Sequence, residues 1–280
     1  MALSFPIPFA KMSGAGNDFI LIDHRVPFLE SVDAMQAFAR AVCERRFSAG
    51  ADGLILIENA AGADFGWQFI NADGSIAEMC GNGARCAARF AHARGIAPAT
   101  MRFQTLAGLI EAEVVGAGVR LKMTPPGNAR LDLTLDIEGQ AQVVHHLNTG
   151  VPHAVLFVTD NATAPVLEWG RLVRYHPQFQ PAGTNVNFVE HLGGDRLLVR
   201  TYERGVEGET MACGTGAVAA AVLAGMKGMV RPPVTVVTSG REELAIHFSL
   251  AGQAVEAVQL EGPASFIYDG QLHPEALRRM

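Results

Sequence analysis

Two stretches of the chain share one pattern, in which a polar, glycine-flanked turn is followed by an Ala-rich apolar run. The first is CGNGARCAARFAHARG, residues 80–95, and the second is CGTGAVAAAVLAGMKG, residues 213–228. They align without a gap at an offset of 133 residues. Ala is the best helix former, and a basic residue followed by Gly marks a helix end. Each stretch therefore predicts a turn that opens a buried helix of about three to four turns.

Patterns typical of short β-strands flank both helices. GWQFIN and RLLVRTYERG precede them, and MRFQTLAGLIEAEV and VTVVTSGREELAIHF follow them. Thr105 and Thr238 keep the same offset. One helix among many short strands indicates a curled sheet wrapped around that helix, and the repeat indicates that this unit occurs twice.

Pro-rich segments mark the expected domain boundaries. At roughly 150 residues per domain, 280 residues suggest about two domains. MTPPGNARL contains Pro125 and Pro126, and VQLEGPASF contains Pro263. We expect an N-terminal domain over 1–124 that carries Cys80, completed by 264–280, and a C-terminal domain over 125–263 that carries Cys213.

Composition narrows the classes of function. The chain is 49% apolar and 18% charged, which suits a packed core. A net charge of −6 without a basic run argues against nucleic-acid binding. No apolar run reaches the ~18–20 residues of a membrane span, and the N-terminus does not resemble a signal peptide. The four cysteines have neither disulfide-scaffold nor zinc spacing. We expect a cytosolic protein without a metal.

Cys80 and Cys213 are the candidate catalytic residues, since each lies at a helix start. Free N–H groups and the helix dipole there stabilise a thiolate, so we expect a thiol pKa below the usual ~8.5. The same N–H groups can hold a carboxylate. If the two halves face each other, one thiolate removes an α-proton and the opposite thiol supplies one to the other face. This pattern predicts inversion of a stereocentre.

Other readings of the cysteines stay open. Cys43, in the helix-like run DAMQAFARAVCERRF, and Cys86 are expected to be buried core residues. Cys80 and Cys213 could instead form a regulatory disulfide, because facing low-pKa thiols oxidise easily.

Five motifs in order make the sequence similar to the diaminopimelate epimerase family, whose members need no pyridoxal phosphate. They are SGAGNDFILID, FINADGSIAEMCGNGARC, TGVPHAVLFV, GTNVNFVE and YERGVEGETMACGTGA. The resemblance implies an α/β (α+β) fold of two pseudo-symmetric domains, each a curved mixed or antiparallel sheet wrapped around a central helix. It also implies an enzyme that interconverts LL- and meso-diaminopimelate for lysine and peptidoglycan synthesis. Such an enzyme would be a cytoplasmic homodimer and would need no cofactor.

The resemblance assigns roles to particular residues. Cys80 and Cys213 become the acid/base pair, and Glu203 receives the reacting ammonium group. His153 stands beside a catalytic cysteine. The carboxylate at the reacting end of the substrate is expected to bind backbone N–H groups. A second set of residues is expected to line the pocket or to hold the distal end of the substrate. These binding residues are Gly81, Asn82, Gly214 and Thr215 for the carboxylate, and Asn17, Asn71, Asn187 and Arg204 for the rest.

Each of these side chains also has a simpler interpretation. Asn17 and Asn71 could be turn residues, Arg204 and Glu203 a surface ion pair, and His153 a structural histidine.

The chain departs from the family pattern in three places. Val151 stands where many members have Asn, Gly53 where some have Gln, and GVEGET is one residue longer than GVGET.

Two other functions compete with diaminopimelate epimerisation. One is a histidine- or proline-type racemase of the same fold, against which Arg204 argues because it would serve a distal carboxylate. The other is a non-catalytic thiol redox switch or binding protein.

Overall fold

The computed structural model describes residues 3–252 and 254–278 of the chain. It divides into two compact units, one made of residues 1–121 and 262–280 and the other of residues 122–261. We call them unit 1 and unit 2. The chain leaves unit 1 within strand β7 and returns to it within strand β16, so unit 1 is built from both ends of the sequence.

Unit 1 is a mixed sheet of eight strands in the order β17-β1-β2-β3-β4-β5-β6-β7, with α1 and α2 packed on it. The pairs β2–β3 and β4–β5 are parallel, and the other pairs are antiparallel. Its elements are β1 (Ile7–Gly14), β2 (Asn17–Asp23), α1 (Val32–Cys43), β3 (Gly53–Glu58), β4 (Phe65–Asn71), α2 (Gly81–Ala93), β5 (Thr100–Thr105), β6 (Gly108–Val115), β7 (Gly118–Met123), β17 (Ser265–Leu272) and the 3₁₀ turn η2 (Pro274–Leu277).

Unit 2 repeats this plan in the order β8-β9-β10-β11-β12-β14-β15-β16, with the parallel pairs β10–β11 and β12–β14 in the same places. The short β13 pairs with the end of β12. Its elements are β8 (Gly127–Ile137), β9 (Gln140–Asn148), β10 (Pro152–Val158), α3 (Val166–Arg174), the 3₁₀ turn η1 (Pro177–Phe179), β11 (Asn185–Gly193), β12 (Arg196–Glu203), β13 (Gly208–Thr210), α4 (Gly214–Met226), β14 (Val234–Thr238), β15 (Glu243–Ala251) and β16 (Ala254–Pro263).

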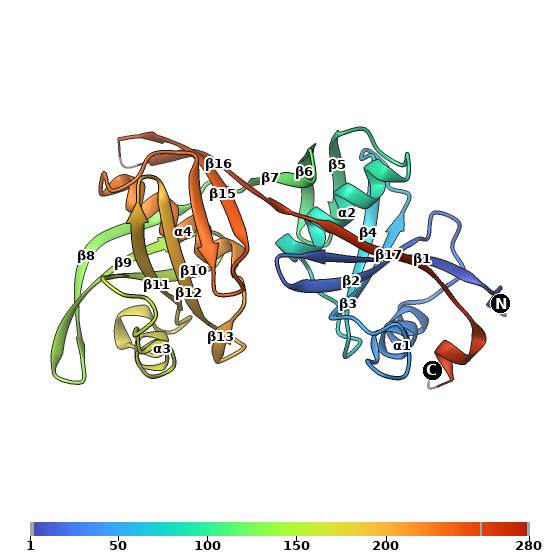
Figure 1. Ribbon diagram of the computed structural model, residues 1–280, viewed down its shortest axis with the longest axis horizontal. Helices are drawn as coiled ribbons and strands as arrows, with labels where there is room; N and C mark the ends of the chain where they lie inside the picture. Colours follow the sequence, from blue (N-terminus) through green and yellow to red (C-terminus); the bar gives the residue numbers. More distant parts are fainter. Residues whose placement is uncertain (1–2, 253, 279–280) are drawn as a thin grey trace. The chain divides into compact units, whose positions relative to one another are not determined.

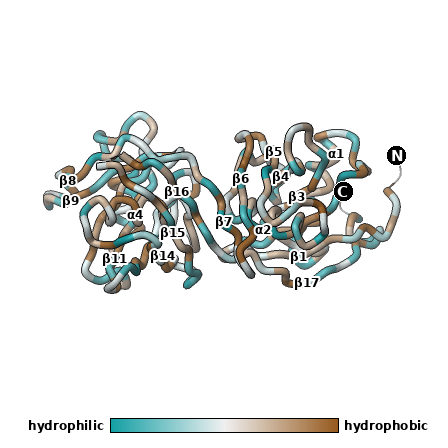
Figure 2. The backbone as a smooth tube through the Cα atoms, turned by 90° about the horizontal axis from the view of Figure 1, so that it is seen from above, coloured by the Kyte–Doolittle hydropathy of each residue, from teal (hydrophilic) through white to brown (hydrophobic). Residues whose placement is uncertain are grey.

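The two central helices confirm the repeat seen in the sequence. Helices α2 and α4 have 13 residues each, and their first residues, Gly81 and Gly214, are 133 positions apart. Helix α4 contacts β9, β10, β11, β12, β14 and β15, so the strands of unit 2 curl around it (Figure 1). Its residues are almost all small or apolar, so the helix can be buried on all sides. Along the backbone of each unit, hydrophobic positions alternate with hydrophilic ones (Figure 2). The predicted fold class, with two pseudo-symmetric domains, is therefore confirmed.

A second helix covers the other face of each sheet. Ser31 caps α1, since its Oγ accepts a hydrogen bond from the Ala34 N–H at 3.2 Å. Phe38 and Val42 of α1 pack in one cluster with Leu54 and other residues of β3. Ile55 of β3 faces α2 instead, so the strand is apolar and buried on both faces from Leu54 to Ile57. In unit 2, α3 packs in the same way on β11 and β12.

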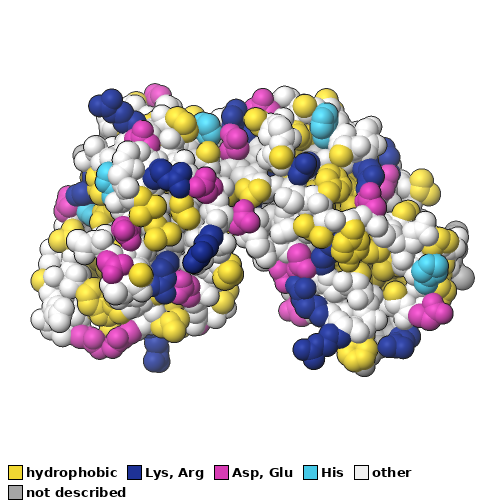
Figure 3. Space-filling model, in the orientation of Figure 1, with side chains coloured by type: hydrophobic (Ala, Val, Ile, Leu, Met, Phe, Trp, Pro, Cys, Tyr) yellow, Lys and Arg dark blue, Asp and Glu magenta, His cyan; other side chains and the backbone are white. Residues whose placement is uncertain are grey.

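The surface carries charges of both signs. On the face in Figure 3, Lys and Arg side chains are interspersed with Asp and Glu in each unit. No helix in the described part of the chain is both long enough and apolar enough to cross a bilayer.

Candidate active site

Cys80 lies at the N-cap of α2, as the sequence predicts. Its backbone is extended, with φ −145° and ψ 117°, and its Sγ accepts from the Gly83 N–H at 3.5 Å. The Cys80 carbonyl accepts the first helical bond, from Ala84, at 2.8 Å. The N–H groups of Gly81 and Asn82 belong to the first turn, where a helix leaves donors for an anion. The thiol and these donors therefore share one helix start.

The Asn82 side chain connects α2 to the start of β2. Its Nδ2 donates to Asn17 Oδ1 at 2.6 Å, and Asn17 Nδ2 donates to Asp52 Oδ2 at 3.1 Å. Arg45 binds Asp52 at 2.9 Å and Asp18 at 2.6 Å. Unit 1 thus brings two predicted binding residues, Asn17 and Asn82, into direct contact.

Asn71 ends β4 and opens a tight turn. Its Nδ2 donates to Ser75 Oγ at 2.9 Å, and its N–H donates to the Ser75 carbonyl at 2.8 Å. Asn71 pairs with Gly53 across β3 and β4. A Cβ on Gly53 would lie 2.7 Å from the Phe69 ring, so packing explains why no Gln stands at this position.

Cys213 lies at the N-cap of α4 in a similar backbone conformation, with φ −123° and ψ 104°. Its Sγ is 3.5 Å from Thr215 Oγ1. Burial raises the pKa of the Cys213 thiol to about 11, and the charge of Glu203 acts in the same direction. Hydrogen bonds from Thr215 and Gly216 only partly oppose this rise. The expectation of a depressed pKa was therefore wrong for Cys213, because desolvation outweighs the helix terminus.

His153 and Asn187 form a buried group on neighbouring parallel strands. Asn187 Nδ2 donates to His153 Nδ1 at 3.1 Å and to the Ala154 carbonyl at 2.9 Å, while Thr201 Oγ1 donates to Asn187 Oδ1 at 2.9 Å. His153 is fully buried, and burial lowers its pKa to about 3, so the ring is neutral. Because Nδ1 accepts, the proton is on Nε2, which has no hydrogen-bond partner among the described residues.

Glu203 is the last residue of β12 and Arg204 follows it, and the two are held by separate partners. Thr210 Oγ1 donates to Glu203 Oε2 at 2.9 Å. The Arg204 N–H donates to Asn185 Oδ1 at 2.8 Å, and Arg204 Nη1 donates to the Ala182 carbonyl at 3.0 Å. The structure therefore ties each residue into the framework of unit 2 through its own set of bonds.

Several residues that support the site were not predicted from the sequence. Three of them lie inside the quoted motifs, namely Arg85, Asn185 and Thr210. Thr201 directly precedes the last motif and Asp52 precedes Gly53, so their place beside these residues was the available signal.

At the other two departures from the family pattern, the residues make hydrogen bonds with nearby groups. The Val151 carbonyl accepts from the Thr149 N–H at 3.1 Å in the bend before β10. The longer loop contains Glu207 at φ 56°, and its carboxylate accepts from the Gly205 N–H at 3.0 Å and from Arg174 at 3.2 Å. Glu207 therefore ties this loop to α3.

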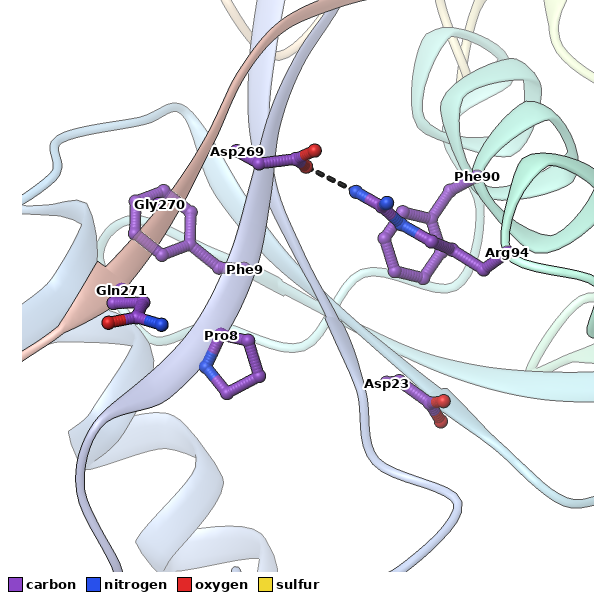
Figure 4. A pocket seen from close by; sticks show the side chains of 8 residues that line it. All are labelled: Pro8, Phe9, Asp23, Phe90, Arg94, Asp269, Gly270 and Gln271. Carbon is purple, nitrogen blue, oxygen red and sulfur yellow. Dashed lines mark hydrogen bonds and ion pairs between the residues drawn. The ribbon is translucent and has the colours of Figure 1, made fainter.

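The surface pocket of unit 1 drawn in Figure 4 is unrelated to the thiols. It has a volume of about 670 Å³, and Phe90 and Arg94 line it from the C-terminal end of α2. Since a 13-residue helix is about 20 Å long, this end lies far from Cys80. Within the described residues, no group of three or more His, Cys, Asp or Glu could hold a metal ion.

Comparison with known proteins gives one consistent result. The sequence profile described as Diaminopimelate epimerase matches residues 9–128 and 146–267. The chain is 47% identical over 279 residues to the diaminopimelate epimerase of Aquifex aeolicus, covering 96% of this chain and 99% of that one. It is 40% identical to the Archaeoglobus fulgidus enzyme of that name, covering 97% and 98%.

Solved structures with the same fold have low sequence identity to this chain. A phenazine biosynthesis protein of the PhzF family from Bacillus anthracis matches with a TM-score of 0.72 at 11% identity, over 96% of this chain and 100% of that one. A probable proline racemase from Agrobacterium radiobacter matches with a TM-score of 0.65 at 17% identity, over 97% and 95%.

Proposed function

Because the chain belongs to the diaminopimelate epimerase family, we propose that it interconverts LL- and meso-diaminopimelate by proton transfer between Cys80, Cys213 and the α-carbon. Family membership makes the chain an isomerase of the epimerase type. The two-thiol mechanism is supported chiefly by the matching positions of the cysteines, each the N-cap of a 13-residue central helix at a constant offset.

The substrate carboxylate is proposed to bind the N–H groups at the starts of both helices, Gly81 and Asn82 on α2, Gly214 and Thr215 on α4. Negative charge moves onto this carboxylate as the α-proton leaves, and the positive ends of the two helices stabilise it in the transition state. A bound metal or carbonyl cofactor is not required for this charge stabilisation.

Each turnover moves two protons. A thiolate on one face takes the α-proton and becomes a thiol, while the thiol on the other face gives its proton to the α-carbon and becomes a thiolate. In one direction Cys80 donates and Cys213 accepts, and the reverse reaction exchanges these roles. The two faces thus require two groups, which a single cysteine cannot supply.

Glu203 links substrate binding to the protonation of the Cys213 thiol. The Glu203 charge raises the pKa of the Cys213 thiol. A substrate ammonium group next to Glu203 would neutralise this charge, so the thiol would lose its proton more readily once the substrate is bound. The neutral Nε2–H of His153 would remain a hydrogen-bond donor in the same unit.

The distal end of the substrate is assigned to Asn17, Asn71, Asn187 and Arg204. A guanidinium suits a carboxylate because it offers paired donors. We also propose that the reaction is a step in the synthesis of lysine and of a peptidoglycan precursor, and that the enzyme is a cytoplasmic homodimer.

The deciding experiment is incubation with LL-diaminopimelate in heavy water, under reducing conditions and without added cofactor. We expect deuterium at the α-position and formation of the meso isomer. Exchange with histidine or proline alone would favour a racemase of another specificity. A lack of exchange with all three would favour the redox or binding protein.

Cysteine variants test the mechanism. Cys80→Ala and Cys213→Ala should each lower the rate of inversion by about 10²–10⁴-fold, the usual contribution of a positioned acid or base. Cys86→Ala is the matched control, because Cys86 is buried in α2 and its counterpart in α4 is Ala219. It should retain activity. Full activity in Cys213→Ala would refute the two-thiol mechanism.

A further inference from the structure

Arg85 is a buried cation in the catalytic segment of α2. Its exposed fraction is 0%, and it is among the largest fully buried side chains of the protein. At the corresponding position α4 has Val218, which is equally buried. A buried guanidinium is costly unless its N–H groups are hydrogen-bonded. Filling space is therefore not a sufficient reason for Arg at this position.

The Arg85 guanidinium binds oxygens at the start of its own helix and on the return segment. Nη2 donates to Asn82 Oδ1 at 2.8 Å, and Nη1 donates to the Gly81 carbonyl at 3.3 Å. Nε donates to the Pro263 carbonyl at 3.1 Å, where the chain re-enters unit 1. Arg85 thus contacts both residues whose N–H groups are proposed to bind the carboxylate.

The hydrogen bonds continue from Asn82 in one direction. Asn82 Nδ2 donates to Asn17 Oδ1 at 2.6 Å, and Asn17 Nδ2 donates to Asp52 Oδ2 at 3.1 Å. A cation stands at one end of this series and a carboxylate at the other. Each amide is therefore held with its oxygen toward Arg85 and its nitrogen toward Asp52. The opposite orientation would place an N–H donor against the Arg85 donors and an acceptor oxygen against the Asp52 carboxylate.

We propose that Arg85 is a positioning residue for carboxylate binding at Cys80, acting through the orientation of the Asn82 amide. Arg85 holds the Asn82 oxygen, so that this partial negative charge is directed away from the bound carboxylate. Without Arg85, the amide can turn and present its oxygen to the anion, which weakens binding. The inference rests on the proposed function, since it assumes that the carboxylate occupies the start of α2.

The test compares two arginines of the same helix. Arg85→Met should raise KM for LL-diaminopimelate about tenfold or more, the loss expected for one charge-assisted hydrogen bond, with a smaller change in kcat. Arg89 binds the next carbonyl of the return segment, that of Ala264, and has no bond to Asn82 among the interactions described. Arg89→Met should therefore leave KM within about twofold of the wild type.

A double-mutant cycle tests the route through Asn82. In an Asn82→Ala background, Arg85→Met should raise KM much less than in the wild type, because the amide that Arg85 orients is absent. Equal effects in both backgrounds would overturn the proposal, as would equal KM values for Arg85→Met and the wild type. An inactive wild type would instead refute the proposed function.

A variant at the other end of the series covers the case in which Arg85→Met does not fold. The Asp52 side chain is 42% exposed, so Asp52→Ala is tolerable for folding. It releases Asn17 and with it the Asn82 amide, and KM should rise in the same direction by a smaller factor. Arg85→Lys, which keeps the charge, should recover part of the loss seen in Arg85→Met. An unchanged KM in folded Asp52→Ala would contradict the proposal.

Discussion

The two units have the same backbone plan around the two thiols but different polar surroundings. In unit 1 the start of α2 is held by charged groups, Arg85 at one end of a series of amides and Asp52 at the other. In unit 2 the corresponding helix is apolar, and the polar groups come from the strands, with Asn187 joined to His153 and Thr201. The repeat therefore preserves the helix start and the thiol, while the groups that support each thiol have diverged.

This difference has a physical consequence for each half. In unit 2 burial lowers the pKa of His153 and keeps its ring uncharged, while burial and the Glu203 charge raise the pKa of the Cys213 thiol. Charged groups at the edge of unit 1 hold their protonation states firmly, since hydrogen bonds from Arg45 and Lys11 overcome burial and lower the pKa of Asp18 to about 2.

The largest effect is expected when unit 2 is given the residue of unit 1. Asn187 and Ile55 occupy equivalent positions, since they lie nearest to the third residues of the two central helices, Gly216 and Gly83, and both are fully buried. Asn187→Ile leaves His153 Nδ1 and the Ala154 carbonyl without their donor. We expect the free energy of unfolding to fall by about 2–6 kcal/mol, at roughly 1–3 kcal/mol for each of these two buried groups. Urea unfolding measures this loss.

Ile55→Val is the control for the equivalent position in unit 1, where only methylene packing changes. It should cost about 1 kcal/mol. A cost for Asn187→Ile no greater than that of the control would show that the polar group of unit 2 contributes little to stability.

A smaller difference in stability is expected between Ala substitutions at the third residues of the two central helices. A Cβ on Gly216 would lie 2.3 Å from Asn187 Oδ1, a side chain that its hydrogen bonds hold in place, whereas a Cβ on Gly83 would first meet the mobile end of Ile55 at 3.2 Å. Gly216→Ala should destabilise the protein by about 1–3 kcal/mol. Gly83→Ala should be near neutral, since Ala favours a helix by about 1 kcal/mol. Thermal unfolding of both variants checks the difference.

The smallest effect, at mildly acidic pH, concerns the order in which the units lose stability. Burial lowers the pKa of His145, His146 and His153 in unit 2, the last from 6.5 to about 3. A folded-state pKa below the unfolded value favours the neutral ring, so this stability is lost as the pH falls below 6.5 toward 3. For Asp18 in unit 1 the loss lies between 3.8 and about 2. As the pH falls, unit 2 should therefore lose stability at a higher pH than unit 1.

Each unit has its own tryptophan to report this order, Trp67 in unit 1 and Trp169 in unit 2. In acid titrations followed by fluorescence, the variant that keeps only Trp169 should change at a higher pH than the variant that keeps only Trp67. The opposite order would mean that the buried histidines do not control the acid stability of unit 2.

Much of the fold and the centre of the site followed from the sequence, because they depend on local patterns. The Ala-rich runs after Cys80 and Cys213 determined two helices with the predicted lengths, and the constant offset determined that the architecture occurs twice. Helix starts are local features, so the positions of both thiols at an N-cap could also be predicted.

Only the tertiary structure decided how each thiol is surrounded. The pKa of Cys213 rises because packing in unit 2 partly desolvates the thiol and because β12 brings Glu203 close, and neither effect is visible in the residues next to Cys213. The bond from Arg85 to the Pro263 carbonyl likewise depends on a strand that returns from 178 residues away. Local sequence determines helices and their ends, whereas desolvation and long-range hydrogen bonds exist only after the chain has packed.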